Sequence, residues 1–81
     1  MIRLRRRQPK QLARKLLAIR SGLGMSQTEM ANALDLKVAY TAISAYERGT
    51  REPDLITLLR YARLARVTVD TLIDDKASLP R

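Results

Sequence analysis

Apolar residues recur every three or four positions along almost all of this 81-residue chain. That spacing places them on one face of an α-helix, and no stretch of strand length alternates apolar and polar residues between turn signals. The periodic segments are short, because glycine, proline or a helix-capping residue interrupts each one. The sequence therefore predicts a compact all-α fold of five short helices, with no room for a second domain.

The second predicted helix has the clearest start. Ser26 can cap it and Glu29, three residues later, can return a hydrogen bond, which is the pattern of a capping box. Met25 and Met30 stand where a hydrophobic staple would pack. This helix is expected to end just before Asp35, where the chain has to turn.

The other helices are predicted from the same kinds of signal. The first is expected from Pro9 to about Ser21, and the third from Ala39 or Tyr40 to Arg48, before Gly49. The fourth follows the cap Asp54, with an apolar face of Leu55, Leu58, Leu59, Ala62 and Leu64 or Ala65. The fifth follows the cap Thr68 and ends at about Asp74. Residues 1–8 lack apolar spacing and are expected to form a flexible basic arm. Residues 75–81 are expected to form a short frayed tail, which places the domain at residues 9–74.

The net charge of +8 is concentrated at one end of the chain. Residues 1–20 carry eight basic residues and no acid, whereas residues 21–81 carry eight bases and eight acids. A basic block of this kind attracts polyanions, nucleic acid before anionic membrane, although it can also serve only for solubility. The run from Arg3 to Arg7 could enter a minor groove, follow a phosphate backbone, or make no contact at all.

The chain contains no cysteine and no histidine. It therefore lacks thiol chemistry, the commonest general base and the commonest metal ligand. With no phosphate-binding loop and no carboxylate cluster at ligand spacing, an enzyme is the least expected function, and no cofactor or metal is predicted. No apolar run is long enough for a membrane span and no apolar h-region follows the basic start, so the sequence predicts a cytoplasmic protein with no membrane partner.

Residues 25–49, MSQTEMANALDLKVAYTAISAYERG, resemble the helix-turn-helix of the phage repressor and Cro-like (XRE-type) family. The matching positions are Met25, Ser26, Gln27, Met30, Ala31, Leu34 and Leu36 in the first half, and Ile43, Ser44, Tyr46, Glu47, Arg48 and Gly49 in the second. The likeness extends through VTVDTLI at 67–73 and covers about residues 10–74. It implies a five-helix lambda-repressor-like domain whose third helix enters the major groove of double-stranded DNA.

Two departures from the family pattern concern the turn. Asp35 stands where glycine is usual, and aspartate tolerates a left-handed backbone better than most residues. Two extra residues lie in the run from Lys37 to Tyr40, which could shift or extend the recognition helix at its first turn.

The resemblance also implies which residues contact DNA. Gln27 would bond a phosphate and brace the recognition helix. Opposite the inward pair Ile43 and Tyr46, the base-reading face would comprise Tyr40, Thr41, Ser44 and Ala45, and the loop beyond it would meet phosphates through Arg48, Thr50 and Arg51. Because this face offers no Asn, Gln or Arg for a bidentate base contact except Arg48 at its far end, direct readout is expected to be modest and supplemented by DNA shape. Tyr40 could instead plug the longer turn.

Glu47 would repel phosphate unless another residue held it. In the family a glutamate at this position pairs with an arginine late in the first helix, and Arg20 is the matching residue, so a structural salt bridge between the two is implied. On the fourth helix the arginines at 60, 63 and 66 recur on one face, and they are expected to be solvated.

The function implied is a transcriptional regulator, a repressor in the leading interpretation, that binds a pseudo-palindromic operator as a homodimer. The apolar residues left over place the dimer surface on the fifth helix and tail, at Val69, Leu72, Ile73 and Leu79. The alternative is an antitoxin-like module whose main role is binding a protein partner as well as DNA. A binder of single-stranded nucleic acid is disfavoured, because three tyrosines are the only aromatic residues available for base stacking.

Overall fold

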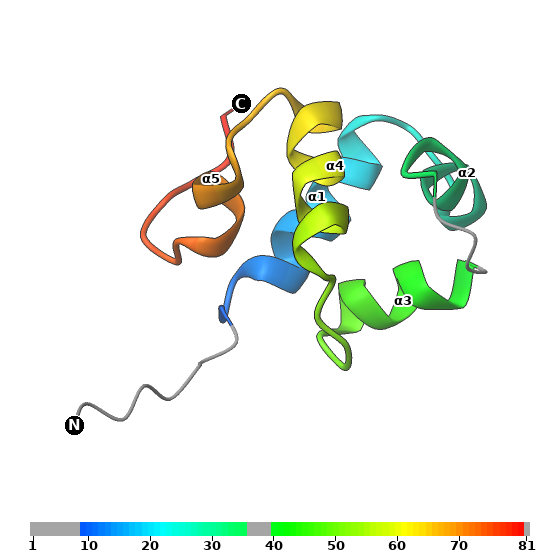
Figure 1. The fold of residues 1–81 in the computed structure, drawn as a ribbon, viewed down its shortest axis with the longest axis horizontal. Helices are drawn as coiled ribbons and strands as arrows, with labels where there is room; N and C mark the ends of the chain where they lie inside the picture. Colours follow the sequence, from blue (N-terminus) through cyan, green and yellow to red (C-terminus); the bar gives the residue numbers. More distant parts are fainter. Residues whose placement is uncertain (1–8, 36–39, 81) are drawn as a thin grey trace.

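The computed structural model describes residues 9–35 and 40–80 (Figure 1). These ranges contain five helices and no strand: α1 (Leu12–Gly22), α2 (Gln27–Ala33), α3 (Tyr40–Arg48), α4 (Leu55–Ala65) and α5 (Val69–Ile73). The predicted all-α fold is therefore confirmed. The predicted basic arm at 1–8 and the extra residues of the turn, within 36–39, lie outside the described residues.

Helix α1 lies in the middle of the fold and packs against α3, α4 and α5. Helices α2 and α3 pack against each other on one side, and α5 with the chain that follows it lies on the other (Figure 1). Every helix contributes to one hydrophobic core, whose largest fully buried side chains are Leu12, Leu16, Met30, Leu34, Ile43, Tyr61 and Leu72. No helix in the described ranges is long and apolar enough to cross a membrane.

The local signals at the ends of α2 and α4 form as predicted. Ser26 Oγ accepts the backbone N–H of Glu29 at 3.0 Å, and Glu29 Oε1 accepts the backbone N–H of Ser26 at 2.9 Å. Asp35 adopts the left-handed conformation, with a φ of 53°. Asp54 Oδ1 caps α4 by accepting the backbone N–H of Thr57 at 2.8 Å. These contacts satisfy N–H groups that have no partner inside a helix.

Three predictions about helix ends and faces are wrong. Helix α1 begins at Leu12 rather than at Pro9. Thr68 occupies the N-cap position of α5 without capping it, because its hydroxyl lies 3.1 Å from the hydroxyl of Thr71 instead. Leu55, predicted on the inner face of α4, is 75% exposed. It stands in the first turn, at the edge of the stripe that buries Leu58, Tyr61 and Ala62.

The start of α1 is capped from a distant part of the chain. Its own N-cap residue, Gln11, makes no capping bond with its side chain. Instead the two carboxylate oxygens of Asp75 accept the backbone N–H groups of Lys10 at 3.1 Å and Gln11 at 3.0 Å. The carboxylate therefore supplies both the acceptors and the negative charge that suit a helix N-terminus.

A second contact joins α1 to the C-terminal segment, and here a side chain of α1 satisfies backbone groups of that segment. The ammonium group of Lys15, which is only 6% exposed, donates to the carbonyl oxygens of Thr71 and Asp74 at 2.8 Å each, at the end of α5. Leu79 packs against the hydrophobic core. The described part of the tail, expected to be frayed, is thus held along α1.

The Asp75 contact generates a prediction about acid stability. The N–H groups of Gln11 and Lys10 hold the pKa of this carboxyl below its ordinary value of 3.8. Its stabilising effect is therefore fully present above that ordinary value and is lost as the pH falls through the lower value of the folded state. We expect Asp75→Asn to lower the free energy of unfolding at pH 7, with the difference from wild type shrinking in acid.

Urea unfolding at a series of pH values measures this difference. The matched control is Asp70→Asn, at an exposed carboxylate in the first turn of α5, which also places a negative charge at a helix start but accepts no hydrogen bond among the described residues. A decrease in stability in Asp75→Asn that is no larger than in the control at pH 7 would contradict the capping role.

Candidate nucleic-acid interface

The two helices of the predicted motif pack through small and apolar side chains. Ala31 on α2 and Ala42 and Ile43 on α3 are all buried. Alanines at such a contact let two helix backbones approach closely. Helix α3 therefore lies against α2 along one side and presents its opposite side outward.

On the outward side of α3, the solvent exposure of the side chains falls from the first turn to the middle of the helix. Tyr40 and Thr41, in its first turn, are exposed, whereas Ser44 and Ala45 in its middle are half-buried. Tyr46 is buried in the core, where the sequence placed it. The first turn is thus the part of α3 with the most surface available to a ligand, and the base contacts of these residues stay a prediction.

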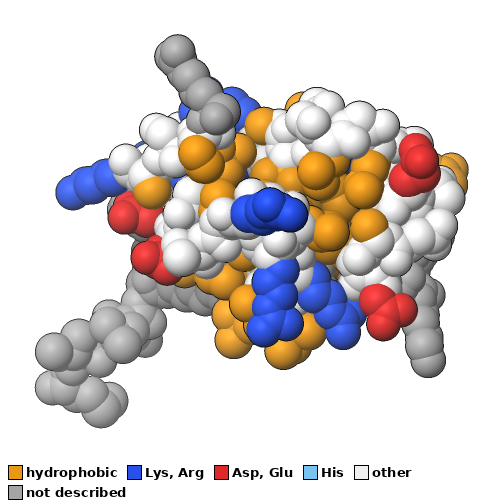
Figure 2. Space-filling model, turned by 90° about the horizontal axis from the view of Figure 1, so that it is seen from above, with side chains coloured by type: hydrophobic (Ala, Val, Ile, Leu, Met, Phe, Trp, Pro, Cys, Tyr) orange, Lys and Arg blue, Asp and Glu red, His pale blue; other side chains and the backbone are white. Residues whose placement is uncertain are grey.

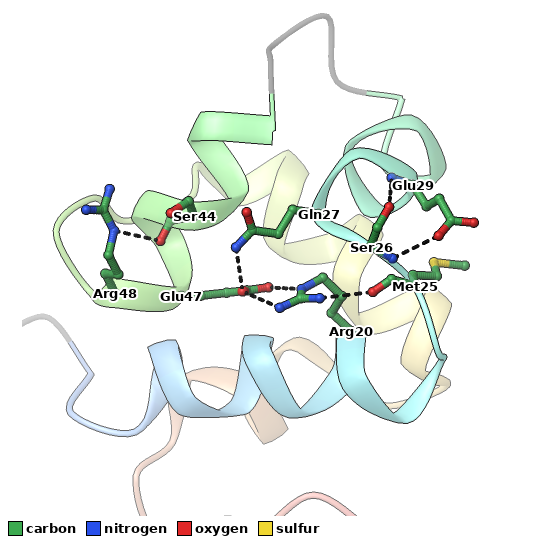
Figure 3. A network of polar contacts seen from close by, with 8 residues as sticks. All are labelled: Arg20, Met25, Ser26, Gln27, Glu29, Ser44, Glu47 and Arg48. Carbon is green, nitrogen blue, oxygen red and sulfur yellow. Dashed lines mark hydrogen bonds and ion pairs between the residues drawn. The ribbon is translucent and has the colours of Figure 1, made fainter.

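Two arginines lie where α3 ends: Arg48 is its last residue, and Arg51 stands in the short loop that follows. Gly49 has a φ of 74°, a left-handed conformation that ends the helix, and the Thr50 hydroxyl donates to the Ala45 carbonyl at 3.3 Å. Arg48 donates from Nε to the carbonyl oxygen of Ser44 at 3.3 Å (Figure 3). The guanidinium of Arg51 lies over the ring of the buried Tyr46, 5.9 Å from its centroid. Both exposed charges are therefore oriented by contacts with α3 itself.

A pair of charged side chains joins α1 to the end of α3 (Figure 3). Arg20 donates from Nε to Glu47 Oε2 at 2.7 Å and from Nη2 to Oε1 at 3.0 Å, and its Nη1 donates to the carbonyl of Met25 at 3.0 Å. The side chains are 19% exposed for the arginine and 5% for the glutamate. Hydrogen bonding to Glu47 raises the pKa of Arg20, so the guanidinium stays charged. Arg20 is the partner that the family resemblance implied.

Gln27 extends this pair to the start of α2. Its Nε2 donates to Glu47 Oε1 at 3.3 Å (Figure 3). The amide therefore points toward the end of α3 and braces it, while a phosphate contact from the same side chain stays a prediction. One carboxylate, that of Glu47, thus connects α1, α2 and α3.

Tyr61 on α4 lies in the core close to this network, and no sequence signal singled it out. Its ring is fully buried, and its hydroxyl has no hydrogen-bond partner among the described residues. Burial, followed by the negative charge of Glu47, raises the pKa of Tyr61, so the phenol stays neutral. The hydroxyl carries a desolvation cost that no contact offsets.

The arginines at 60 and 63 on α4 and at 66 on its C-cap differ, although the sequence predicted one solvated face for all of them. Arg63 and Arg66 are exposed, as predicted. Arg60 is half-buried, and its Nη1 donates to the carbonyl oxygens of Leu34 at 3.0 Å and Asp35 at 3.4 Å, at the end of α2. The prediction is wrong for Arg60, because helix periodicity does not reveal that a neighbouring helix ends beside it.

Basic side chains also lie outside the motif. On the face seen from above in Figure 2, Lys and Arg side chains gather near the middle beside exposed hydrophobic ones, and Asp and Glu side chains lie toward the two sides. The basic side chains on this face thus lie mainly between the acidic ones.

The Arg20–Glu47 pair predicts an asymmetry between its two partners. Arg20→Met leaves a buried carboxylate with only Gln27 as partner, and we expect it to lower the free energy of unfolding by about 3–5 kcal/mol. Glu47→Gln leaves the more exposed arginine, which still donates to Met25, so we expect a smaller decrease of about 1–3 kcal/mol.

Urea denaturation of both variants tests this order. Arg14→Met, at an exposed arginine on the same helix, is the control and should stay within about 0.5 kcal/mol of wild type. Equal decreases in Arg20→Met and Arg14→Met would show that the pair contributes no stability.

The sequence matches one known protein family, and the fold matches several solved structures. Residues 16–72 match the sequence model of a family described as Helix-turn-helix. The fold is similar to that of the P22 c2 repressor protein in complex with a synthetic operator in the presence of Tl⁺, with 23% identity over 80% of this chain and 96% of that one and a TM-score of 0.71. No curated protein sequence matches the chain at a significant level.

Two other solved structures are similar. In the SinR protein/SinI protein complex, the likeness has 26% identity and a TM-score of 0.70 and covers 80% of this chain but 62% of that one. A hypothetical transcription factor, NHTF, from Neisseria has 25% identity and a TM-score of 0.66, with coverage of 90% and 88%.

Proposed function

Because this chain belongs to the helix-turn-helix family of non-enzymatic DNA-binding regulators, we propose that it acts as a repressor that reads one operator in double-stranded DNA. The observation that carries the proposal is the outward side of α3, which begins with exposed polar residues and ends beside two exposed arginines. The P22 c2 repressor protein, to which the fold is similar, is bound to an operator in its structure. Such a regulator would act in the cytoplasm.

Base reading is assigned to the first turns of α3 in the major groove. The hydroxyls of Thr41 and Ser44 can donate to or accept from base edges, and the methyl groups of Thr41 and Ala45 can meet the methyl group of thymine. Tyr40 can reach the sugar-phosphate backbone beside them. Since none of these side chains forms a bidentate base contact, the shape and deformability of the operator would supply much of the specificity.

Phosphate contacts are assigned to Arg48, the last residue of α3, and to Thr50 and Arg51 just beyond it, together with Gln27 at the start of α2. The two positive charges sit near the C-terminal end of α3, where they also offset the negative end of that helix dipole. Contacts of this kind set orientation and affinity rather than sequence preference.

The proposed regulator is a homodimer, since one recognition helix reads too few base pairs to specify a site. The dimer surface predicted from sequence requires correction: Leu72 is fully buried, and Val69 and Leu79 pack against the core. Ile73 is 43% exposed, but among the described residues the most exposed large apolar side chains are Leu55 at 75% and Ile56 at 58%, in the first turn of α4. We therefore assign the contact with the second copy to this first turn.

The antitoxin-like alternative would use an end of the chain that becomes ordered on its protein partner. Within the described tail, Asp75 caps the start of α1 and Leu79 packs against the core, which argues against its being such an end, while residues 1–8 lie outside the described part. The SinR protein, similar in fold, is found with the SinI protein, and a partner that co-purifies with this chain would favour the alternative.

Salt dependence of DNA binding tests the phosphate assignment. We expect the wild-type protein to bind long mixed-sequence duplex DNA with a steep negative slope of log affinity against log salt. Removing one arginine that neutralises a phosphate should reduce that slope by about 0.9, so Arg48→Ala with Arg51→Ala should reduce it by about 1.8 and weaken binding.

The control is a double variant that removes the same charge from exposed residues elsewhere, Arg63→Ala with Lys76→Ala. Binding that is steep in salt but equally affected by both double variants would mean that the basic arm alone holds the DNA. Absence of binding by the wild type would overturn the proposed function itself.

Sedimentation equilibrium tests the dimer surface. Ile56→Glu buries a charge in the proposed contact, and we expect it to convert the dimer into a monomer with little change in thermal stability, because the side chain is exposed within one copy. Leu23→Glu, at an exposed leucine on the α1–α2 turn, is the control. A dimer that persists in Ile56→Glu and dissociates in Leu23→Glu would place the contact elsewhere.

A further inference from the structure

Arg60 is a charged side chain that connects α4 to the end of α2, close to the turn that leads into α3. We propose that it is a positioning residue for the first turn of α3, where Tyr40 and Thr41 are exposed. This inference rests on the proposed function, since it concerns how well α3 discriminates between DNA sequences.

The contact occurs where α2 has no partners of its own. Leu34 is the C-cap residue of α2, and its carbonyl and that of Asp35 lie beyond the last bonds that the helix makes. Arg60 Nη1 donates to these two carbonyls at 3.0 and 3.4 Å. A cation at the C-terminal end of a helix also interacts favourably with the helix dipole. The arginine therefore holds the end of α2 through directional hydrogen bonds as well as through its charge.

Two arginines from different helices hold the two ends of the motif. Arg20 of α1 acts through Glu47 and Gln27 at the start of α2 and the end of α3. Arg60 of α4 acts at the other end, where α2 stops. With both ends held, α2 has little freedom to rotate or shift relative to α1 and α4.

The position of α2 sets the position of the first turn of α3. Only residues 36–39 separate Asp35 from Tyr40, and the two helices are packed on each other through buried side chains. A shift at the end of α2 therefore moves the residues assigned to base edges. Binding sites held about 1 Å too loosely lose their function even when every contact residue is present.

A residue that only stabilises the fold and a residue that positions α3 predict different results. Reduced stability lowers the fraction of folded protein, and so it weakens binding to every DNA sequence equally. Reduced positioning weakens contacts with bases, whereas phosphate contacts, which depend less on exact geometry, are retained.

The first experiment compares two DNA affinities in each variant. The wild type is used to select a preferred duplex from a randomised library, and affinities for this duplex and for mixed-sequence duplex are then measured at one salt concentration. We expect the ratio of the two affinities to fall about tenfold in Arg60→Met, the size of one charge-assisted hydrogen bond. Its affinity for mixed-sequence duplex should fall no further than in Arg63→Met, which removes the same charge from an exposed site on α4.

Arg60→Lys should restore part of the ratio, because it keeps the charge and a donor. A ratio in Arg60→Met equal to that in Arg63→Met would overturn the proposal. So would an equal decrease in both affinities, since that is the signature of reduced stability alone.

The second experiment needs no DNA and so separates this proposal from the proposed function. Amide hydrogen exchange is measured for Ser44 and Ala45, whose N–H groups bond to the carbonyls of the first turn of α3, in the wild type, Arg60→Met and Arg63→Met, under conditions where each is folded. We expect about tenfold faster exchange in this segment in Arg60→Met alone, with the amides of α1 unchanged. Unchanged exchange would overturn the positioning role of Arg60, even if the protein binds DNA. A wild type that binds no DNA would instead overturn the proposed function, and the exchange rates would still decide whether Arg60 positions α3.

If Arg60→Met fails to fold, both measurements are made on Arg60→Gln instead. Glutamine is shorter and lacks the charge but keeps an amide donor. A ratio and an exchange rate equal to those of Arg63→Met would then overturn the proposal in the same way.

Discussion

The arrangement of the helices depends on the two hydrogen bonds between Arg20 and Glu47. Apolar packing is non-directional, so a core of leucine, isoleucine and alanine side chains leaves α2 and α3 able to slide by small amounts at little cost. The paired charges have a narrow range of favourable geometries and lie where α1, α2 and α3 meet. A chain of this length buries only about 60% of its unfolded surface, so directional contacts decide orientations that a larger core would otherwise determine.

Sequence signals predicted those features that depend on near neighbours in the chain. The box formed by Ser26 and Glu29, the cap from Asp54 and the left-handed Asp35 each involve residues within three positions, and all three form. The pairing of Arg20 with Glu47, 27 positions apart, could be inferred only from the family resemblance. Which residues of α3 face outward followed from helix periodicity, but their graded exposure depends on the packing of α2.

Contacts between segments that are distant in the chain produce no local sequence pattern from which they could be predicted. A lysine or arginine that donates to the carbonyls at the end of another helix has the same sequence pattern as one in solvent, which is why Lys15 and Arg60 were not predicted. Tyr61 lies on a helix whose stripe is defined by leucines, so the pattern does not distinguish it, although it fills the centre of the core. The spacing of Leu55 fits the interior, yet it is exposed while Thr57 and Leu58 of the same turn are buried, a difference that depends on the packing of other helices.

The contact between Asp75 and the start of α1 also bears on how the chain folds. It joins residues 64 and 65 positions apart, so the first helix gains its cap only after nearly all of the domain has been synthesised. Helical domains usually fold fast because most of their contacts are local, whereas this one must close a long loop to complete its first element. During translation, the start of α1 would therefore stay uncapped until the tail has been synthesised, and a chain that ends before residue 75 would leave the first turn of that helix frayed.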